Sequence, residues 1–214
     1  PVHPWARFYF GLAQAISSRL GDPNIQAFVL VHRGYYEAGM GHWAEAEKDL
    51  VESRALYDRI GDIRMAEESM SILAYALFFK GELKRSDALY RELERSGDER
   101  VDTQIMGWGA ANRLKLRVRT GQLTGADAML RQVDGLLVDG ITKAVRDGIE
   151  VELELARGDL DAAYEAAVAA MDRLERSAPR TFMVVSTYAA IADAVLRRWK
   201  ASEQAGRSDD VRVV

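Results

Sequence analysis

The side chains that most often carry out chemistry are sparse in this chain, and their spacing matches no catalytic or metal-binding pattern. The sequence has three histidines and no cysteine, so disulfide bonds and thiolate ligands are excluded. His42 and Glu45 lie three residues apart, but a zinc site would need a second ligand pair, and the sequence has none. We therefore expect His3, His32 and His42 on the surface or in a groove, and we expect no metal or other cofactor.

Neither the carboxylates nor the glycines supply a catalytic pattern. No helical segment carries the D-D-x-x-D cluster that a metal-dependent diphosphate enzyme would need, and Asp209-Asp210 falls in a polar stretch. Gly107-Trp108-Gly109 is not a phosphate loop because no strand precedes it, and the chain has no G-x-x-x-x-G-K-[ST] motif. The chain is therefore predicted not to be an enzyme, and a helical enzyme is the least favoured of the functions considered.

A basic segment is the clearest cluster of charge in the sequence. Between Thr103 and Ala126 there is no acidic residue, and the segment carries four basic ones: Arg113, Lys115, Arg117 and Arg119. On a helix, Lys115 and Arg119 share one face, and Arg113 and Arg117 share another. Lys115 and Arg119, together with Asn112, could hold a carboxylate or phosphate through charge-assisted hydrogen bonds.

Ion pairing within the protein is the alternative role for the same basic residues. A later segment carries three acidic residues at alternate positions: Glu150, Glu152 and Glu154. Surface pairs of this kind contribute only about 0–1 kcal/mol each. Pairing is the favoured prediction for Arg113 and Arg117, whereas both roles stay open for Lys115 and Arg119.

Four short sequence strings resemble one another, and their spacing predicts the helices on which these residues lie. GHWAEA begins at Gly41, GELKRS at Gly81, GQLTGA at Gly121 and GDLDAA at Gly158, so the spacings are 40, 40 and 37 residues. A fixed period of this length is typical of stacked helical hairpins. The glycine allows a tight turn, the large residue two positions later closes the hairpin, and the small residue five positions later lets two helices approach closely.

The fold class follows from this period and from the absence of proline between residues 24 and 178. Gly-Asp and Asp-Gly pairs such as Gly97-Asp98 and Asp139-Gly140 mark the remaining helix ends. We predict an all-α, right-handed α-solenoid of about ten helices without strands. The helices are expected at residues 4–20, 24–39, 43–60, 63–80, 83–96, 99–120, 123–138, 141–157, 160–177 and 180–199.

Three parts of the chain are expected to differ in role. Residues 1–22 form either a capping helix or half of a repeat, residues 23–200 form the repeat domain, and residues 201–214 form a polar tail. The first helix has aromatic and apolar residues along one side, and that side must be covered or becomes a sticky patch. Those residues are Trp5, Phe8, Tyr9 and Leu12.

Composition limits the partners. With 48% hydrophobic and 29% charged residues the chain can form an ordinary core, and its net charge of −4 disfavours nucleic acid. No apolar run is long enough for a membrane span, and the N-terminus lacks the features of a signal peptide. We therefore expect a cytoplasmic protein with no membrane contact. Because the sequence does not begin with Met, we also expect a fragment of a longer protein.

The repeat spacing resembles that of the tetratricopeptide repeat, over about residues 24–177. In that pattern a small residue precedes the turn glycine by seven positions; Gly34 and Ala74 match it, and Leu114 and Val151 do not. The usual closing proline is missing, and the period exceeds 34 residues, which implies helices about one turn longer than the standard repeat.

The resemblance implies that the first helix of each hairpin lines a concave groove. Laid on this sequence, it gives a partner-binding surface that is aromatic in the first half and polar in the second. The candidate residues are Tyr35, Tyr75, Phe78, Phe79, Trp108, Asn112, Lys115 and Arg119. The alternative is that the rings are buried between repeats, as ordinary core.

A narrower resemblance concerns RGYYEAGMGHWAEAEKDL and ALYDRIGDIRMAEESMSILAYALFFKGEL. These runs look like the C-terminal repeat region of bacterial multidomain regulators, which join a class III nucleotide cyclase or another output domain to a signalling ATPase. The resemblance implies a regulatory arm that binds a peptide, a partner helix or another domain of the same chain. The alternative function is a sensor that binds a small molecule or signal peptide in a closed apolar pocket.

Overall fold

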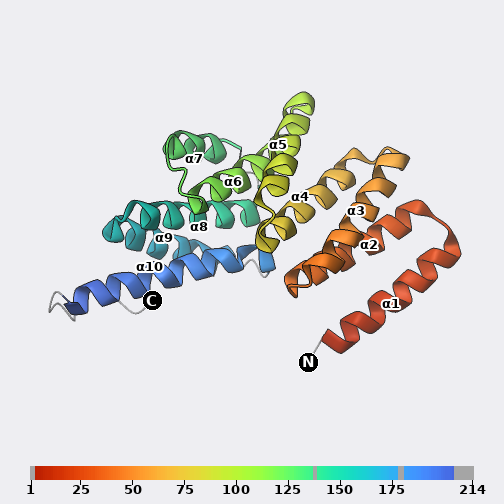
Figure 1. The fold of residues 1–214 in the computed structure, drawn as a ribbon, viewed down its shortest axis with the longest axis horizontal. Helices are drawn as coiled ribbons and strands as arrows, with labels where there is room; N and C mark the ends of the chain where they lie inside the picture. The colour runs from red at the N-terminus through yellow and green to blue at the C-terminus, as the bar shows by residue number, and fades with distance from the viewer. Residues whose placement is uncertain (1–2, 137–138, 178–180, 205–214) are drawn as a thin grey trace. The chain divides into compact units, whose positions relative to one another are not determined.

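The computed structural model of the chain describes residues 3–136, 139–177 and 181–204, and every regular element in those ranges is helical (Figure 1). The predicted all-α arrangement of helical hairpins is confirmed. The elements are α1 (His3–Leu20), α2 (Pro23–Gly39), α3 (Trp43–Ile60), α4 (Ile63–Lys80), α5 (Leu83–Arg100), α6 (Thr103–Arg119), α7 (Ala126–Asp134), α8 (Gly140–Arg157), α9 (Leu160–Ser177), the 3-10 turn η1 (Phe182–Val184) and α10 (Val185–Gln204).

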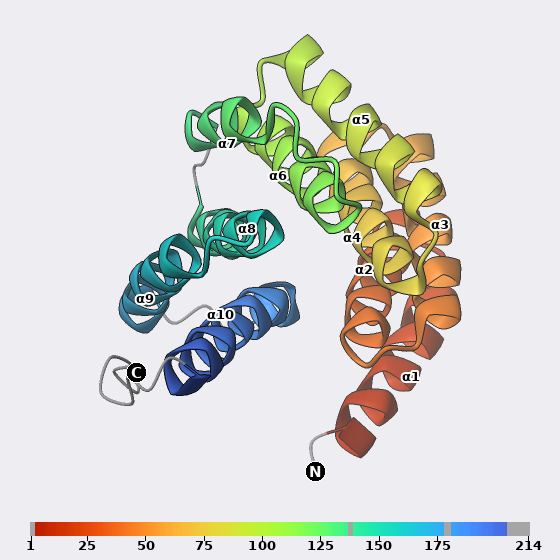
Figure 2. The same ribbon diagram turned by 60° about the vertical axis from the view of Figure 1, so that its left-hand side comes forward.

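The helices belong to two compact units, Pro1–Leu93 and Glu94–Val214, which divide within α5. The first unit contains α1 to α4 and most of α5. The second contains α6 to α10, with α8 packed against α6, α9 and α10 (Figure 2). The division falls inside the residues 23–200 that the sequence assigns to one repeat domain.

The repeated glycines end the first helix of each hairpin as predicted. All four have positive φ, and Gly81 and Gly158 are the left-handed C-caps of α4 and α8, with φ of 88° and 80°. Glycine adopts this conformation without the strain that a Cβ would add. Aspartates start the next helices: the Asp102 carboxylate, for example, accepts from the backbone N–H groups of Gln104 and Ile105.

Close helix contact in the first hairpin depends on residues of the repeated string. Ala46 and Leu50 of α3 are fully buried, and a Cβ added to Gly34 of α2 would lie 2.7 Å from Leu50 Cγ. The Ser53 hydroxyl donates to the Ala27 carbonyl of α2 at 2.9 Å. The missing Cβ of Gly34 therefore makes room for a leucine on the facing helix.

The second unit has two apolar clusters on opposite sides of α8. One joins Val145, Ile149 and Leu153 of α8 to residues of α6 and α7. The other joins Ala144 and Val151 of α8 to α9 and α10. Because both sides of α8 are buried, only a narrow face of this helix is left for polar side chains, and that face lines the site described below.

The turn predicted at Gly97-Asp98 is wrong. Helix α5 continues to Arg100, and the chain turns at Val101, which has a φ of 57°. Gly97 lies inside the helix because α6 approaches it: an added Cβ would lie 2.7 Å from the Met106 backbone nitrogen. The glycine thus serves helix packing, and the prediction mistook it for a helix end.

Two other helix boundaries also differ from the prediction. Helix α7 covers only Ala126–Asp134 because Gly125 takes a left-handed conformation before it, with φ of 76°. Helix α10 begins at Val185, after the turn η1, and extends to Gln204, so the first four residues of the predicted polar tail are helical. The rest of that tail, including Asp209-Asp210, lies outside the described residues.

Candidate functional site

Two of the four predicted aromatic residues of the first unit are not available to a partner. Tyr75 and Phe78 on α4 are only 3% and 8% exposed, whereas Phe79 is 38% exposed and Tyr35 on α2 is half-buried. The Phe79 ring stacks on Trp43 of α3, with ring centroids 5.8 Å apart. A buried ring offers a ligand almost no area, so Tyr75 and Phe78 are core residues and are removed from the candidate surface.

Trp108 and Asn112 on α6 are half-buried and hydrogen-bonded within the second unit. The Trp108 indole nitrogen donates to the Asp139 carboxylate at 3.4 Å, and the Asn112 side-chain amide donates to the Trp108 carbonyl at 2.9 Å. Trp108 therefore supports the start of α8, since Asp139 is the N-cap of that helix.

The predicted basic clamp does not form. Lys115 is 3% exposed, and its ammonium donates to the Ser186 hydroxyl of α10. Burial lowers the Lys115 pKa to about 8, although the nearby charge of Glu152 opposes this shift. Arg119 forms a two-pronged ion pair with Glu152 of α8, with nitrogen–oxygen distances of 2.6 and 3.0 Å.

The alternative of internal pairing holds for this segment, but with other partners than predicted. Arg119 takes the acidic partner on α8, whereas Arg113 pairs with Glu94 of α5 and Arg117 donates to the Thr124 carbonyl at 2.7 Å. The sequence located the acidic helix correctly but assigned it to the wrong arginines. The direction in which each side chain points depends on how α6 packs against its neighbours, and helical spacing alone does not determine this packing.

An open groove of about 670 Å³ lies on the second unit, between α7 and α9, with α8 as its floor. We call it the charged groove. Five acidic and three basic side chains line it: Asp134, Asp147, Glu150, Glu154 and Glu165, with Lys143, Arg146 and Arg173. The α9 wall also contains three small residues at helical spacing: Ala162, Ala166 and Ala169.

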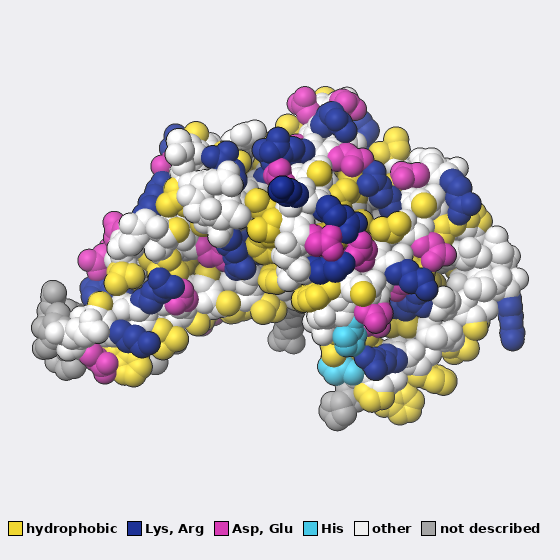
Figure 3. Space-filling view, in the orientation of Figure 1, with side chains coloured by type: hydrophobic (Ala, Val, Ile, Leu, Met, Phe, Trp, Pro, Cys, Tyr) yellow, Lys and Arg dark blue, Asp and Glu magenta, His cyan; other side chains and the backbone are white. Residues whose placement is uncertain are grey.

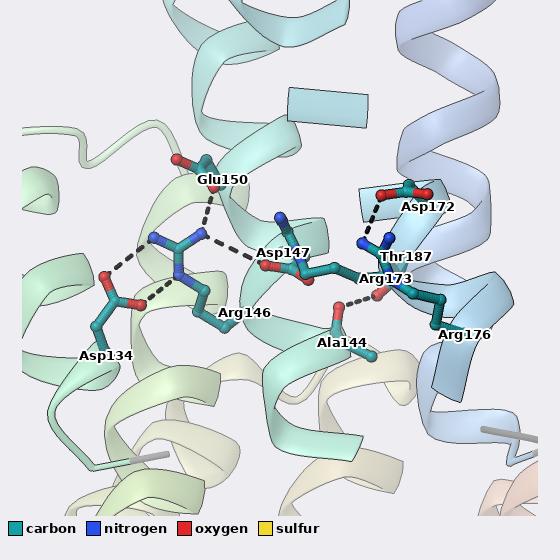
Figure 4. A network of polar contacts seen from close by, with 9 residues as sticks. All are labelled: Asp134, Ala144, Arg146, Asp147, Glu150, Asp172, Arg173, Arg176 and Thr187. Atoms are coloured by element: carbon teal, nitrogen blue, oxygen red, sulfur yellow. Dashed lines mark hydrogen bonds and ion pairs between the residues drawn. The ribbon is translucent and has the colours of Figure 1, made fainter. Parts of the chain in front are cut away.

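Arg146 organises the floor of the charged groove (Figure 4). Its guanidinium binds Asp134 of α7 at 2.6 and 3.1 Å, pairs with Glu150 one turn along α8, and reaches Asp147 at 3.5 Å. Burial alone would lower the Arg146 pKa, but the hydrogen bond to Asp134 and the charge of Glu150 outweigh it and raise the pKa. Arg146 is therefore a fixed cation that ties α7 to α8.

Asp147 connects the floor to the α9 wall. It is buried, and its carboxylate accepts from Arg173 Nε of α9 at 2.7 Å. This hydrogen bond is the main reason that the Arg173 pKa is raised. Glu165 and Lys143, by contrast, form no ion pair within the described residues, so their charges are open to a bound segment.

The sequence analysis missed this site, although a pattern for it was present. Lys143, Arg146, Asp147, Glu150 and Glu154 recur at intervals of three, one, three and four residues, which places them on one face of a helix. Only the acidic residues near the end of this run were considered, and they were treated as partners of α6. A row of charged residues along one face of a helix whose other faces are apolar would have indicated the groove.

The histidines contact groups of the first unit. His3 Nδ1 lies 3.2 Å from the Tyr36 hydroxyl, and His42 pairs with Glu37 at 2.5 Å. His32 is exposed, and its Nδ1 lies 2.8 Å from the Phe28 carbonyl. Within the described ranges, no three His, Asp or Glu side chains converge as a metal ion would require.

No model of a known protein family matches this chain, and no characterised protein is significantly similar to it in sequence. Among the described helices, none combines the length and the apolar character needed to cross a membrane.

Proposed function

We propose that this chain is a protein-interaction module of the tetratricopeptide-like kind, and that it binds a polypeptide segment in the charged groove. The observation that carries the proposal is the form of the groove: about 670 Å³ in volume, open to solvent and lined by charges of both signs. The segment would come from a partner protein or, in a multidomain regulator, from another domain of the same protein.

The composition of the groove favours a basic segment. Five carboxylates face three basic groups, and Glu165 forms no ion pair within the described residues. The alanines of α9 allow the backbone of the bound segment to come close, while the fixed pairs around Arg146 keep the floor in place. Charge complementarity of this type sets the specificity and association rate of binding more than its affinity.

The sensor function is less well supported, because a small-molecule site is normally an enclosed, mostly apolar cavity. The charged groove is open, and eight of its eleven lining residues carry a charge. We also propose a cytoplasmic setting, in line with the absence of cysteine.

The proposal can be tested by selecting from a random displayed dodecapeptide library on the purified protein. Enriched peptides are expected to carry Lys or Arg, and fluorescence anisotropy would measure their affinities. Glu165→Lys is expected to weaken binding at least tenfold. Glu175→Lys makes the same charge change at an exposed site on α9 outside the groove, and it should leave affinity unchanged.

Two results would contradict this function. One is a library that yields no peptide beyond those that bind an unrelated control protein. The other is equal affinity for the parent, Glu165→Lys and Glu175→Lys, which would place binding elsewhere on the molecule.

A further inference from the structure

Helices α1 and α3 occupy the same position in the repeat. Gly21-Asp22 follows α1 as Gly61-Asp62 follows α3, so an offset of 40 residues aligns the two helices. The offset pairs Ala6 with Ala46 and Phe10 with Leu50. Ala46 and Leu50 are fully buried, whereas Ala6 and Phe10 are only half-buried. Helix α1 thus takes the place of the second helix of a hairpin, and in the described part of the chain the element packed against it is α2.

The solvent-facing side of α1 is apolar, whereas the same side of α3 is charged. A missing repeat neighbour does not explain this difference. On α3, three positions of this face are exposed and charged: Glu45, Lys48 and Glu52. The offset replaces them by three large apolar residues: Trp5, Phe8 and Leu12. In a standard repeat these positions face solvent, so their apolar character points to a contact outside the repeat stack.

The exposed apolar residues of α1 form a single stripe, which we call the α1 stripe. They recur at intervals of three, one, three, four and four residues, and each is between 46% and 63% exposed: Trp5, Phe8, Tyr9, Leu12, Ile16 and Leu20. Hydrophobic side chains along α1 are visible in the space-filling view (Figure 3). No charged residue occurs from Phe8 to Ser18, and Gly11 and Ala15 stand beside the stripe.

The pattern of the stripe indicates which partner fits. Its first half is aromatic and its second half aliphatic, so an identical stripe running antiparallel would place rings against smaller side chains. With the two-fold axis between Leu12 and Ala13, residues whose numbers add up to 25 face each other, so Trp5 faces Leu20 and Tyr9 faces Ile16. The stretch from Phe8 to Ser18 has no charged side chain that would demand an oppositely charged partner, and Arg19 lies at the C-terminal end of the same face. Gly11 and Ala15 let two helix backbones approach.

We propose that two copies of this chain associate through their α1 stripes, antiparallel about a two-fold axis near Leu12. An isologous contact of this type is the commonest form of protein oligomer. Six side chains that bury on the order of 100 Å² each in both copies give roughly 1,200 Å², the lower limit for a specific interface. The dimer is therefore expected to dissociate at micromolar concentrations. The proposal is independent of the charged groove.

Sedimentation velocity over a concentration series tests the association. The parent should pass from monomer to dimer, and Leu12→Asp should raise the dissociation constant at least tenfold, since it places two like charges at the axis. Val51→Asp is the matched control, because Val51 on α3 is 48% exposed and lies outside the α1 stripe. A parent that stays monomeric at every concentration, or a dimer unaffected by Leu12→Asp, would overturn the proposal.

The absence of cysteine allows a direct test of the antiparallel geometry. Single variants Trp5→Cys and Leu20→Cys would be treated with a short bis-maleimide cross-linker, alone and as a mixture. The antiparallel dimer predicts efficient cross-linking only in the mixture, and Leu12→Cys should cross-link with itself. Cross-linking of Trp5→Cys alone would indicate parallel helices, and dimers lost on Trp199→Asp instead of Leu12→Asp would indicate a contact through α10; either result excludes the proposed interface.

Discussion

Two hairpins, one in each unit, place a large and a small side chain on opposite helices at the same positions of the repeat. In the first unit the small residue is on the first helix of the hairpin, as in Gly34 facing Leu50. In the second unit Val151 of α8 and the fully buried Ala167 of α9 belong to one apolar cluster, with the sizes reversed. Either helix can therefore supply the large member of the pair, whereas the hairpin of α6 and α7 has a large residue on both helices, Leu114 and Leu130, so the combined volume differs between hairpins.

The next position along the first helix differs in chemistry as well as size. It holds Tyr35 and Tyr75 in the first unit, and Lys115 and Glu152 in the second. The second unit thus has side chains that are normally charged at neutral pH where the first has tyrosine rings. Lys115 illustrates the consequence, because the helix packing that buries it also lowers its pKa to about 8.

Exchanging the small and the large residue between α2 and α3 should have the largest effect on stability. Gly34→Val is expected to destabilise the protein by about 3 kcal/mol, because the new side chain overlaps Leu50. Adding Leu50→Ala should recover at least about 1 kcal/mol, since the double variant copies the Val151 and Ala167 combination. Denaturant unfolding of both variants measures this coupling. Additive losses would show that the side chains at positions 34 and 50 do not compete for the same space.

A second change should affect both units alike. Ala46 in the first unit and Ala163 in the second are fully buried at the same position of the repeated string. Ala46→Leu and Ala163→Leu are each expected to lower the free energy of unfolding by about 2 kcal/mol through overpacking. Thermal melting curves that match the parent would remove the packing role assigned to this position.

The buried aspartates provide a finer comparison. Asp49 binds Arg33 in the first unit, and Asp147 binds Arg146 and Arg173 in the second. We expect Asp49→Ala to lower stability by about 2 kcal/mol and Asp147→Ala by about 1 kcal/mol. The second loss is smaller because Arg146 keeps Asp134 and Glu150 as partners. The two denaturation midpoints measure the difference, and the reverse order would refute this account.

The smallest effect concerns the pH dependence of the second unit. The folded-state pKa of Lys115 is about 8, below the ordinary lysine value of 10.5, so the unfolded state binds more protons between these values. Stability should therefore rise with pH, by about 1 kcal/mol between pH 7.5 and 9, relative to Lys115→Met. Urea unfolding of both proteins across this range is the measurement. Parallel pH profiles would mean that Lys115 is not desolvated in the folded protein.

The sequence by itself determined most of the helix positions. Turn glycines such as Gly81 and capping aspartates such as Asp62 act on the backbone within a few residues, so their effect can be read locally. The period then identified the hairpins, and the small residue of each string identified the contact between their helices. The uncovered side of the first helix was also evident, because its residues fall on one face.

Only the tertiary structure decided which side chains are accessible. Tyr75 is buried and Phe79 is exposed although both lie on α4, and Lys115 contacts Ser186, a residue 71 positions away. Gly97 was mistaken for a helix end. A glycine is needed there because Met106 of the next helix approaches it closely. The charged groove likewise depends on α7, α8 and α9 together. Burial and ion pairing depend on helices that are distant in the chain, and local sequence signals carry no information about those distances.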